Sequence, residues 1–357
     1  MSTSTKARQN PFSEAVLNWF QVHGRKNLPW QQNPNPYRVW ISEIMLQQTQ
    51  VSTVIPYYEK FMLSFPDIKQ LALAESDKVL HHWTGLGYYA RARNLHKTAR
   101  LIHHEHNGVF PSSFEGLIEL PGIGRSTAGA IIALAGNKRA AILDGNVKRV
   151  LCRYHCIEGW PQQGQTLEKL WALAEQLTPP NDCRDYTQAM MDLGATLCTR
   201  TKPQCSACPL QLTCQAYLSN RMAEFPNKKT KKLIPQKSTQ MIILHSPDGQ
   251  KVLLEKRPPQ GIWGGLWSFP EIQESDTIDH FLSSHGFSAR AKPVQCDEIR
   301  HTFSHFRLII KPQLLSLSKM PAAIMEKPDW HWYDLDKPSE LGLAAPVNTL
   351  LKKLGNK

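Results

Sequence analysis

The stretch LPGIGRSTAGAIIALAGNKRAAILD, from Leu120 to Asp144, decides the fold of the first half of this chain. Its Pro-Gly-Ile-Gly run stands between two apolar segments, which predicts a helix, a tight turn with glycine at unusual backbone angles, and a second helix entered at Ser126 and Thr127. The turn of such a hairpin exposes backbone N–H groups that bind an anionic oxygen, so a nucleic-acid phosphate is a natural ligand. A plain helix-helix turn is the alternative. The candidate contact residues are Leu120, Pro121, Gly122, Ile123, Gly124 and Arg125.

Asp144 closes this stretch, at the point where an apolar run ends and the helical sequence GNVKRV begins. An aspartate in front of a helix is commonly an N-cap, because its carboxylate accepts hydrogen bonds from the first backbone N–H groups. A chemical role for the carboxylate is the other possibility, and further features of the chain favour it.

The charge balance of the chain favours a polyanionic partner. Lys and Arg number 42 against 30 Asp and Glu, which gives a formal net charge of +12. Nucleic acid fits this excess better than a membrane, because no basic amphipathic anchor is evident; a basic protein without such a partner is the alternative. No run approaches the about 18 apolar residues of a membrane span. The N-terminus lacks the apolar core of a secretory signal, so we expect a cytoplasmic protein with reduced thiols.

The length of 357 residues allows two or three domains. From Pro11 to about Tyr217 apolar residues recur three and four apart, which predicts helices. A stretch rich in lysine and proline follows, which includes Lys228, Lys229, Lys231 and Lys232. Beyond it the period of the apolar residues shortens, which predicts strands at 241–245, 251–257 and 307–317. Helices are expected near 277–286 and 346–354. The expected organisation is a flexible tail at 1–10, a helical domain at 11–223, a basic linker at 224–237 and a smaller α+β domain at 238–357.

Four cysteines follow one another closely as Cys198, Cys205, Cys208 and Cys214. Four thiols in one loop of a reducing compartment indicate a shared metal group. Zinc is possible, but structural zinc sites usually combine two separate Cys-x2-Cys pairs and only one is present. A compact loop of four thiolates fits a 4Fe-4S cluster better. We expect the scattered Cys152, Cys156, Cys183 and Cys296 to be packing residues.

The hairpin, Asp144 and the cysteine loop together resemble the helix-hairpin-helix superfamily of DNA glycosylases. The segments PYRVWISEIMLQQTQV (36–51), TGLGYYARARNLHK (84–97) and RHTFSHF (300–306) are similar to those of the MutY family of adenine DNA glycosylases. This resemblance implies a mainly α catalytic region of two helical lobes with an iron-sulfur loop, followed by an α+β Nudix-like domain.

Breaking the bond between adenine and deoxyribose requires an acid that protonates the departing base and a negative charge beside the cationic sugar. Glu43 lies among apolar neighbours such as Trp40 and Met45, so desolvation should raise its pKa and keep it protonated. Asp144, beside Asn146, is in a polar setting that we expect to favour the ionised form, which could stabilise an oxocarbenium-like state or trap it covalently. The family pattern assigns the acid and the stabilising charge to Glu43 and Asp144; without the resemblance, Glu43 would be a carboxyl at the edge of an amphipathic helix.

Ser126 occupies the hairpin position at which the related bifunctional glycosylases carry a lysine that attacks the sugar. A serine cannot form the Schiff base. We therefore expect base removal through water, without efficient strand cleavage.

The target base must leave the stack before its glycosidic bond can be reached. Gln48, with Leu46, and Tyr88 resemble the residues of the family that enter the vacated space, and Trp30 resembles one that lines the adenine pocket; each could also be core or surface filler. Three basic residues beyond Tyr88 are candidates for phosphate binding or for a solvated helix face. They are Arg91, Arg93 and Lys97.

The segment GLWSFPEIQESDTIDHFLSSHGF (265–287) resembles the Nudix signature, with Gly265, Glu271 and Gly286 in register. The magnesium-binding carboxylates are replaced by Ser283 and Ser284, so hydrolase activity should be absent. The resemblance instead implies recognition of 8-oxoguanine by the loop Phe303, Ser304 and His305, although an ordinary strand end would have the same sequence.

The resulting hypothesis is a monofunctional glycosylase that removes adenine mispaired with 8-oxoguanine or guanine and so begins base-excision repair. Its partner would be double-stranded DNA with such a mispair, which it would bind as a monomer. We expect no membrane partner and a cytoplasmic location at the nucleoid. The alternatives are an endonuclease III-like glycosylase and lyase, a non-catalytic iron-sulfur DNA-binding scaffold, and a pyrophosphohydrolase that uses the second domain.

Overall fold

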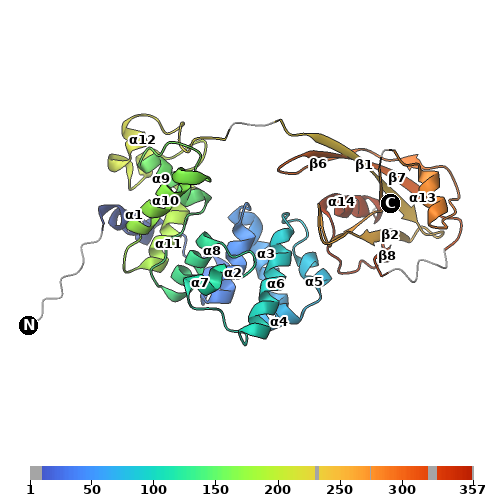
Figure 1. The fold of residues 1–357 in the computed structure, drawn as a ribbon, viewed down its shortest axis with the longest axis horizontal. Helices are drawn as coiled ribbons and strands as arrows, with labels where there is room; N and C mark the ends of the chain where they lie inside the picture. The colour runs from blue at the N-terminus through green and yellow to red at the C-terminus, as the bar shows by residue number, and fades with distance from the viewer. Residues whose placement is uncertain (1–9, 230–232, 274, 321–327, 356–357) are drawn as a thin grey trace, which may run out of the picture. The chain divides into compact units, whose positions relative to one another are not determined.

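The computed structural model describes residues 10–229, 233–273, 275–320 and 328–355. The chain forms two compact units (Figure 1). Met1–Ala72 and Lys97–Thr230 make up the first, here called the helical unit, and Leu73–His96 and Lys231–Lys357 make up the second, here called the sheet unit. Residues 1–9 of the predicted tail, and the linker residues Lys231 and Lys232, lie outside the described residues.

Helices form where the apolar periodicity predicted them, and polar side chains cap several of their first turns. Asn10 accepts from the backbone N–H of Phe12 at 2.9 Å, and Asn35 accepts from that of Arg38 at 2.9 Å. Each cap satisfies a donor that has no partner within its own helix. The helices of the first part of the chain are α1 (Pro11–His23), α2 (Pro36–Leu46), α3 (Val51–Ser64), α4 (Ile68–Leu73), α5 (Ser76–His82), α6 (Ala90–Glu105), α7 (Phe114–Ile118), α8 (Arg125–Ala130), α9 (Gly145–Tyr154), α10 (Gly164–Leu177), α11 (Cys183–Asp192) and α12 (Gln215–Leu218).

The helical unit consists of two packed groups of helices. In one group α2 packs against α3 and α8, and α7 packs against α8; in the other, α11 packs against α1 and α9, and α9 also contacts α10 and α12. Short helical turns complete both groups. They are η1 (Pro29–Gln31), η4 (Cys205–Ala207) and η5 (Gln211–Thr213), together with the π-helical segments η2 (Ile131–Ala135) and η3 (Leu193–Leu197).

The predicted hairpin is formed by α7 and α8. Gly122 adopts a φ of 80°, a left-handed conformation that glycine reaches without steric cost. Gly124 has a φ of −90° and is the N-cap of α8, so the second helix begins at Arg125 and the predicted start at Ser126 and Thr127 is wrong by one residue. Leu120 and Ile123 are buried, whereas Gly122 and Gly124 are exposed at the turn.

The described start of the linker is attached to the helical unit. Asn227 accepts from the backbone N–H of Gly159 at 2.7 Å, and the Lys229 ammonium lies 4.6 Å from the centre of the Trp160 ring. A cation held over an indole ring is stabilised by the ring quadrupole. Lys229 is therefore placed against protein.

The sheet unit is built on a mixed sheet whose strands follow the order β3-β2-β1-β7-β5, with β4 paired to β1, β6 to β7 and β8 to β2. Its long central strands β1 and β7 run parallel, with Gln236 opposite Arg307 and His245 opposite Ser316. The strands are β1 (Gln236–His245), β2 (Lys251–Lys256), β3 (Trp267–Ser268), β4 (Glu271–Ile272), β5 (Val294–Gln295), β6 (Ile299–Thr302), β7 (Arg307–Ser316) and β8 (Trp330–Asp334).

The core of the sheet unit lies between the sheet and α13 (Ile278–Ser284), where Phe281 and Phe287 pack against Ile242 and Leu315. A further helix, α14 (Ala345–Gly355), buries Val347. The predicted division into a mainly helical first part and an α+β second part is confirmed. Among the described helices, none has both the length and the apolar character needed to cross a membrane.

Candidate active site

Glu43 lies on α2, a helix whose apolar residues near it in the sequence are buried. Trp40, Ile44 and Met45 are each at most 3% exposed. Burial raises the pKa of Glu43 to about 8, and the negative charge of Asp144 contributes in the same direction. The predicted direction of this pKa is thus confirmed, and the carboxyl holds its proton near neutral pH.

Asp144 is the N-cap of α9. One carboxylate oxygen accepts from the backbone N–H of Val147 at 2.8 Å, and the other accepts from Nδ2 of Asn146 at 3.0 Å. Burial raises the pKa of Asp144, while these hydrogen bonds and the guanidinium of Arg149 lower it. The polar setting favours the ionised form as expected, but desolvation outweighs the hydrogen bonds, so the pKa of Asp144 is raised overall.

The structure brings Glu43 and Asp144 close enough for the charge of one to act on the other, although a hundred positions separate them in the chain. The two carboxyls differ in their surroundings. Asp144 accepts hydrogen bonds that favour its ionised form, whereas its own charge disfavours ionisation of Glu43. The charge of Asp144 therefore favours the protonated form of Glu43, and the two carboxyls titrate as a coupled pair.

Arg149 connects Asp144 to the cysteine loop. Its guanidinium donates to Oδ1 of Asn146 at 2.8 Å and to the backbone carbonyl of Cys198 at 2.7 Å. It also donates to the carbonyl of Gly194 at 2.7 Å. A side chain on Gly194 would place its Cβ 2.5 Å from that of Asn146, so only glycine allows η3 to approach α9 this closely.

Ser126 lies beside the segment that leads into Asp144. Its hydroxyl accepts a hydrogen bond from the backbone N–H of Leu143 at 3.0 Å. The side chain is therefore engaged in holding the peptide that precedes the carboxylate.

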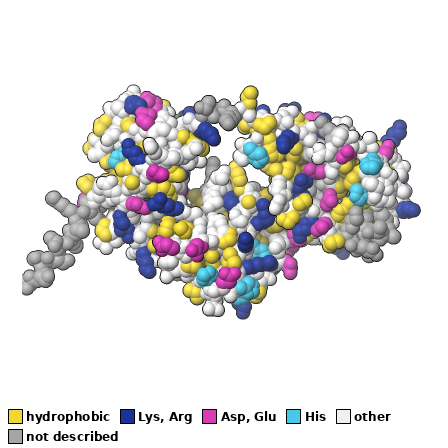
Figure 2. Space-filling model, in the orientation of Figure 1, with side chains coloured by type: hydrophobic (Ala, Val, Ile, Leu, Met, Phe, Trp, Pro, Cys, Tyr) yellow, Lys and Arg dark blue, Asp and Glu magenta, His cyan; other side chains and the backbone are white. Residues whose placement is uncertain are grey.

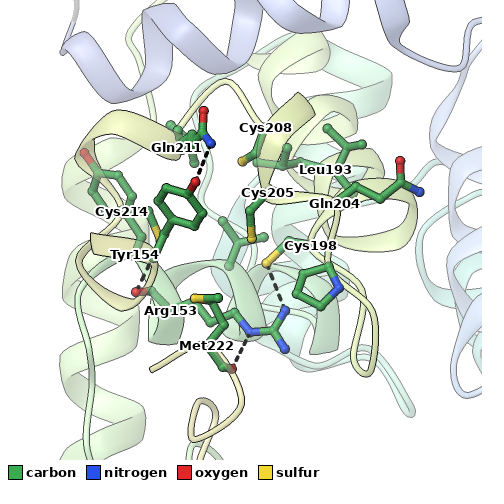
Figure 3. Close-up of a pocket in the computed structure, with 15 residues that line it drawn as sticks. Arg153, Tyr154, Leu193, Cys198, Gln204, Cys205, Cys208, Gln211, Cys214 and Met222 are labelled. Atoms are coloured by element: carbon green, nitrogen blue, oxygen red, sulfur yellow. Dashed lines mark hydrogen bonds between the residues drawn. The ribbon is translucent and has the colours of Figure 1, made fainter. Parts of the chain in front are cut away.

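The four cysteines of the loop line one cavity in the helical unit, which encloses about 430 Å³ of space, open solvent included. Figure 3 shows the sulfur atoms of Cys198, Cys205 and Cys208 facing this space from neighbouring turns of the chain. Cys214 lines the same cavity, and its thiol lies 3.6 Å from the carbonyl of Arg153. None of the eight cysteines forms a disulfide. Among the four scattered cysteines, Cys152 and Cys183 are buried, as expected for packing residues, whereas Cys156 and Cys296 are only partly buried.

Arg153 supplies positive charge at this cavity. Its guanidinium lies 3.3 Å from the Cys198 sulfur (Figure 3). It also donates to the carbonyls of Thr199 and Phe225 at 2.7 and 3.0 Å. In the described part of the chain, no group of three or more His, Cys, Asp or Glu side chains is placed to hold a single metal ion. The donor set nevertheless fits a cluster bound by several thiolates, because four sulfurs and a fixed cation surround one cavity.

Gln48 and Trp30 occupy different environments. Gln48 follows α2 with a φ of 59° and is exposed, whereas Leu46 is partly buried at the end of the helix. Trp30 is only 5% exposed and meets the edge of the Tyr58 ring at 5.4 Å. A left-handed conformation at a residue other than glycine stores strain, and such strain is often found at functional positions.

Tyr88 lies at the tip of the loop between α5 and α6. It is 51% exposed and has a φ of 48°. Arg91 stabilises the loop, because its guanidinium donates to the carbonyl of Gly87 at 3.2 Å and lies 5.4 Å from the centre of the Trp83 ring. The interpretation of Arg91 as a phosphate ligand is wrong, because it is buried and engaged with the loop. Lys97 is exposed.

Arg125 of the hairpin is held by α10. Its guanidinium stacks over the Trp171 ring at 4.0 Å and forms an ion pair with Glu175. The pair is exposed, and exposed ion pairs contribute little free energy, so the arginine retains the ability to exchange partners.

Phe303, Ser304 and His305 form the turn between β6 and β7, closed by a hydrogen bond of 2.9 Å from the backbone N–H of Phe303 to the carbonyl of Phe306. Ser304 and His305 are exposed. The Phe303 ring packs on Trp263 at 5.3 Å and stacks on Phe306 at 4.7 Å. The turn therefore exposes the polar side chains of Ser304 and His305, while the Phe303 ring packs against other aromatic rings.

Glu271, which matches the Nudix register, is engaged within the protein. It forms an ion pair with Arg257 at 2.5 Å and accepts from the Thr239 hydroxyl at 3.3 Å. The hydroxyls of Ser283 and Ser284 donate to backbone carbonyls on α13. These side chains give no cluster of carboxylates at the positions where the Nudix pattern places its magnesium ligands.

Sequence reasoning missed Arg149 and Arg153. Both lie on α9 after Asp144, four positions apart, so they share a helix face, and that spacing was the available signal. Their partners, Cys198 and Thr199, are distant in the sequence, and nothing local indicated that the two arginines meet the cysteine loop.

Comparison with known proteins identifies the families to which the two parts of the chain are related. Residues 41–176 match the family model of the HhH-GPD superfamily base excision DNA repair protein, and residues 240–353 match that of the NUDIX domain. The adenine DNA glycosylase of Buchnera aphidicola subsp. Acyrthosiphon pisum is 42% identical, over 96% of this chain and 97% of its own length. The human adenine DNA glycosylase is 33% identical, over 98% of this chain and 74% of its own length.

Solved structures agree in fold. A thermostable thymine-DNA glycosylase superposes with a TM-score of 0.54 at 29% identity, over 58% of this chain and 95% of its own. An endonuclease III in a non-covalent DNA complex has the same fold, with a TM-score of 0.51 at 21% identity over 60% of this chain and 96% of its own. Identity above 40% across nearly the whole of both chains leads to one conclusion: this chain belongs to the adenine DNA glycosylase family.

Proposed function

We propose that this chain is a monofunctional DNA glycosylase that hydrolyses the N-glycosidic bond of adenine mispaired with 8-oxoguanine or guanine and thereby starts base-excision repair. One observation carries the proposal: two carboxyls from distant parts of the chain interact, and the pKa of one is raised to about 8. Relatives named adenine DNA glycosylase, which match over 96% and 98% of this chain, support it.

Glu43 is the proton donor in this proposal. Held neutral by burial, it protonates the departing adenine, which cannot leave readily as an anion. The carboxylate of Asp144 then stabilises the cationic sugar, and water completes the hydrolysis. Asn146 keeps the Asp144 carboxylate oriented through the hydrogen bond of 3.0 Å.

Ser126 makes the enzyme monofunctional. A lyase of this fold needs an amine that attacks the sugar, and a hydroxyl that accepts from Leu143 supplies none. An endonuclease III-like activity is therefore disfavoured, although the fold is shared.

We assign the cysteine cavity to a 4Fe-4S cluster held by Cys198, Cys205, Cys208 and Cys214. When bound, such a cluster supplies strong metal-thiolate bonds that tie the ends of the loop together. Arg153 would balance the negative charge of the thiolates. Because Arg149 donates hydrogen bonds to both Cys198 and Asn146, it would hold these two residues at a fixed distance from each other.

Double-stranded DNA is the partner. The net charge of +12 favours it, and Figure 2 shows Lys and Arg side chains spread over the displayed face with acidic side chains between them. We infer that the backbone N–H groups of the turn from Leu120 to Arg125 bind a phosphate. Gln48 and Tyr88 enter the base stack, while Trp30 and Leu46 shape the base pocket. The turn of Phe303, Ser304 and His305 contacts 8-oxoguanine. The exposure of Gln48, Tyr88 and Ser304 supports these roles.

Incubation with a duplex that carries adenine opposite 8-oxoguanine tests the proposal. Adenine should be released, and the strand should break only after alkaline treatment. A duplex with adenine opposite thymine is the control and should stay intact. Absence of adenine release would refute the glycosylase, and efficient breakage without alkali would refute the monofunctional assignment.

A further inference from the structure

The Tyr88 loop and the sheet that carries the Phe303 turn belong to one compact unit. Leu73–His96 groups with Lys231–Lys357, although the two segments are far apart in the sequence. The contacts between them are specific and polar. The sheet can therefore affect the position of the Tyr88 loop.

Tyr89 makes the most direct connection. Its hydroxyl donates to the backbone carbonyl of Leu343 at 3.1 Å and accepts from the backbone N–H of Gly85 at 3.3 Å. Thr84, at the start of the loop, accepts from the backbone N–H of Leu343 at 3.4 Å. Leu343 in turn forms a bridge with Trp267 of β3, so the loop is attached to the edge of the sheet.

Gly342 allows this close approach. A Cβ on Gly342 would lie 2.4 Å from the Cβ of Leu80, and its carbonyl accepts from the backbone N–H of Trp267 at 2.8 Å. Nearer the start of α5, Lys256 of β2 pairs with Asp77 at 3.0 Å. The segment that carries Tyr88 is thus bound to the sheet at α5 as well as through Tyr89 and Thr84.

Arg93 connects the same segment to the Phe303 turn. Its guanidinium donates to the carbonyl of Gly264 at 2.7 Å. The residue before Gly264 is Trp263, whose ring packs on Phe303 at 5.3 Å and on His301 at 5.4 Å. Arg93 therefore has a partner within the sheet unit, and its role as a phosphate ligand stays a prediction.

We propose that Tyr89 and Arg93 are positioning residues that couple the Phe303–His305 turn to Tyr88, so that contact with 8-oxoguanine is transmitted to the residue that enters the stack. The inference rests on the proposed function. The path is continuous: Phe303 packs on Trp263, and Gly264, which follows Trp263 in the chain, accepts from Arg93. The backbone N–H of Arg93 donates to the carbonyl of Tyr89 at 3.1 Å, and Tyr89 directly follows Tyr88. Neither residue contacts the reacting atoms in this proposal.

The test compares single-turnover rates of adenine release opposite 8-oxoguanine and opposite guanine. Tyr89→Phe removes one hydroxyl and keeps the ring, and Arg93→Met removes one donor and keeps the stem. Each should lower the ratio of the two rates about fivefold, the effect of losing the hydrogen bond to Leu343 or to Gly264, mainly by slowing release opposite 8-oxoguanine. Tyr37→Phe is the matched control, since its buried hydroxyl donates to the carbonyl of Phe65 at 2.6 Å in the helical unit. The control should leave the ratio unchanged.

Non-additivity separates positioning from a general loss of stability. If Tyr89 acts through Tyr88, then Tyr89→Phe should have no further effect on the ratio in a protein that already carries Tyr88→Ala. An unchanged ratio in folded Tyr89→Phe and Arg93→Met, or additive effects with Tyr88→Ala, would overturn the inference. If one variant does not fold, the other decides. Absence of adenine release by the unaltered protein would instead refute the proposed function.

Discussion

Replacement of Glu43 by glutamine should stabilise the fold while it abolishes the chemistry. Burial and the charge of Asp144 raise the pKa of Glu43 from its ordinary 4.5 to about 8. The folded protein therefore binds this proton more tightly than the unfolded chain does. The stability that the proton contributes is complete below pH 4.5 and is lost as the pH rises towards 8.

The size of the effect follows from this difference. Each pH unit above the unfolded-state pKa costs about 1.4 kcal/mol until the folded-state pKa is reached. The cost is about 1 kcal/mol at pH 5 and about 4 kcal/mol at pH 7.5. Glutamine has nearly the same shape and no charge, so Glu43→Gln should recover these amounts.

Urea denaturation of the two proteins at pH 5 and pH 7.5 measures the difference. The exposed Glu59 on α3, changed to glutamine, gives the baseline for loss of a surface charge. The gain from Glu43→Gln should grow by about 3 kcal/mol between the two pH values. A gain that is the same at both, or a loss of stability at pH 7.5, would show that Glu43 is not held neutral.

Three further predictions concern the same site. The single-turnover rate should fall about tenfold between pH 7 and pH 9, because Glu43 loses the proton it must donate near pH 8; a rate that rises over this range would contradict the assignment. Gly194→Ala should cost about 2 kcal/mol by forcing Asn146 away from Asp144, whereas Gly136→Ala, with only ordinary contacts nearby, should cost far less. Arg149→Met should reduce both adenine release and retained iron, because it removes the donor shared by Asn146 and Cys198; full iron content with a normal rate would refute the connection.

Local sequence patterns predicted the features that depend on near neighbours. The glycine turn, the cap at Asp144 and the cysteine loop each need residues within a few positions of one another, so periodicity and spacing revealed them. The strands β1 and β2 followed from a short period and the turn at Gly249. The first residue of α8 was misplaced because Gly124 caps the helix in an extended conformation, and β1 begins at Gln236, five residues before its predicted start.

Features that depend on distant contacts could not be predicted. The pKa of Asp144 is raised by burial that the whole helical unit creates, whereas the sequence shows only its polar neighbours. Arg91 and Arg93 resembled phosphate ligands on an exposed helix face. The structure engages Arg91 with the Tyr88 loop and Arg93 with Gly264, which lies far along the chain.

The rate of adenine release by the Glu43→Gln protein tests the account most directly. In a single turnover on a duplex with adenine opposite 8-oxoguanine, release should fall at least about 100-fold, as expected for loss of a general acid. Affinity for the duplex should stay near that of the unaltered protein. Release at close to the original rate by a correctly folded variant would show that the proton comes from another group.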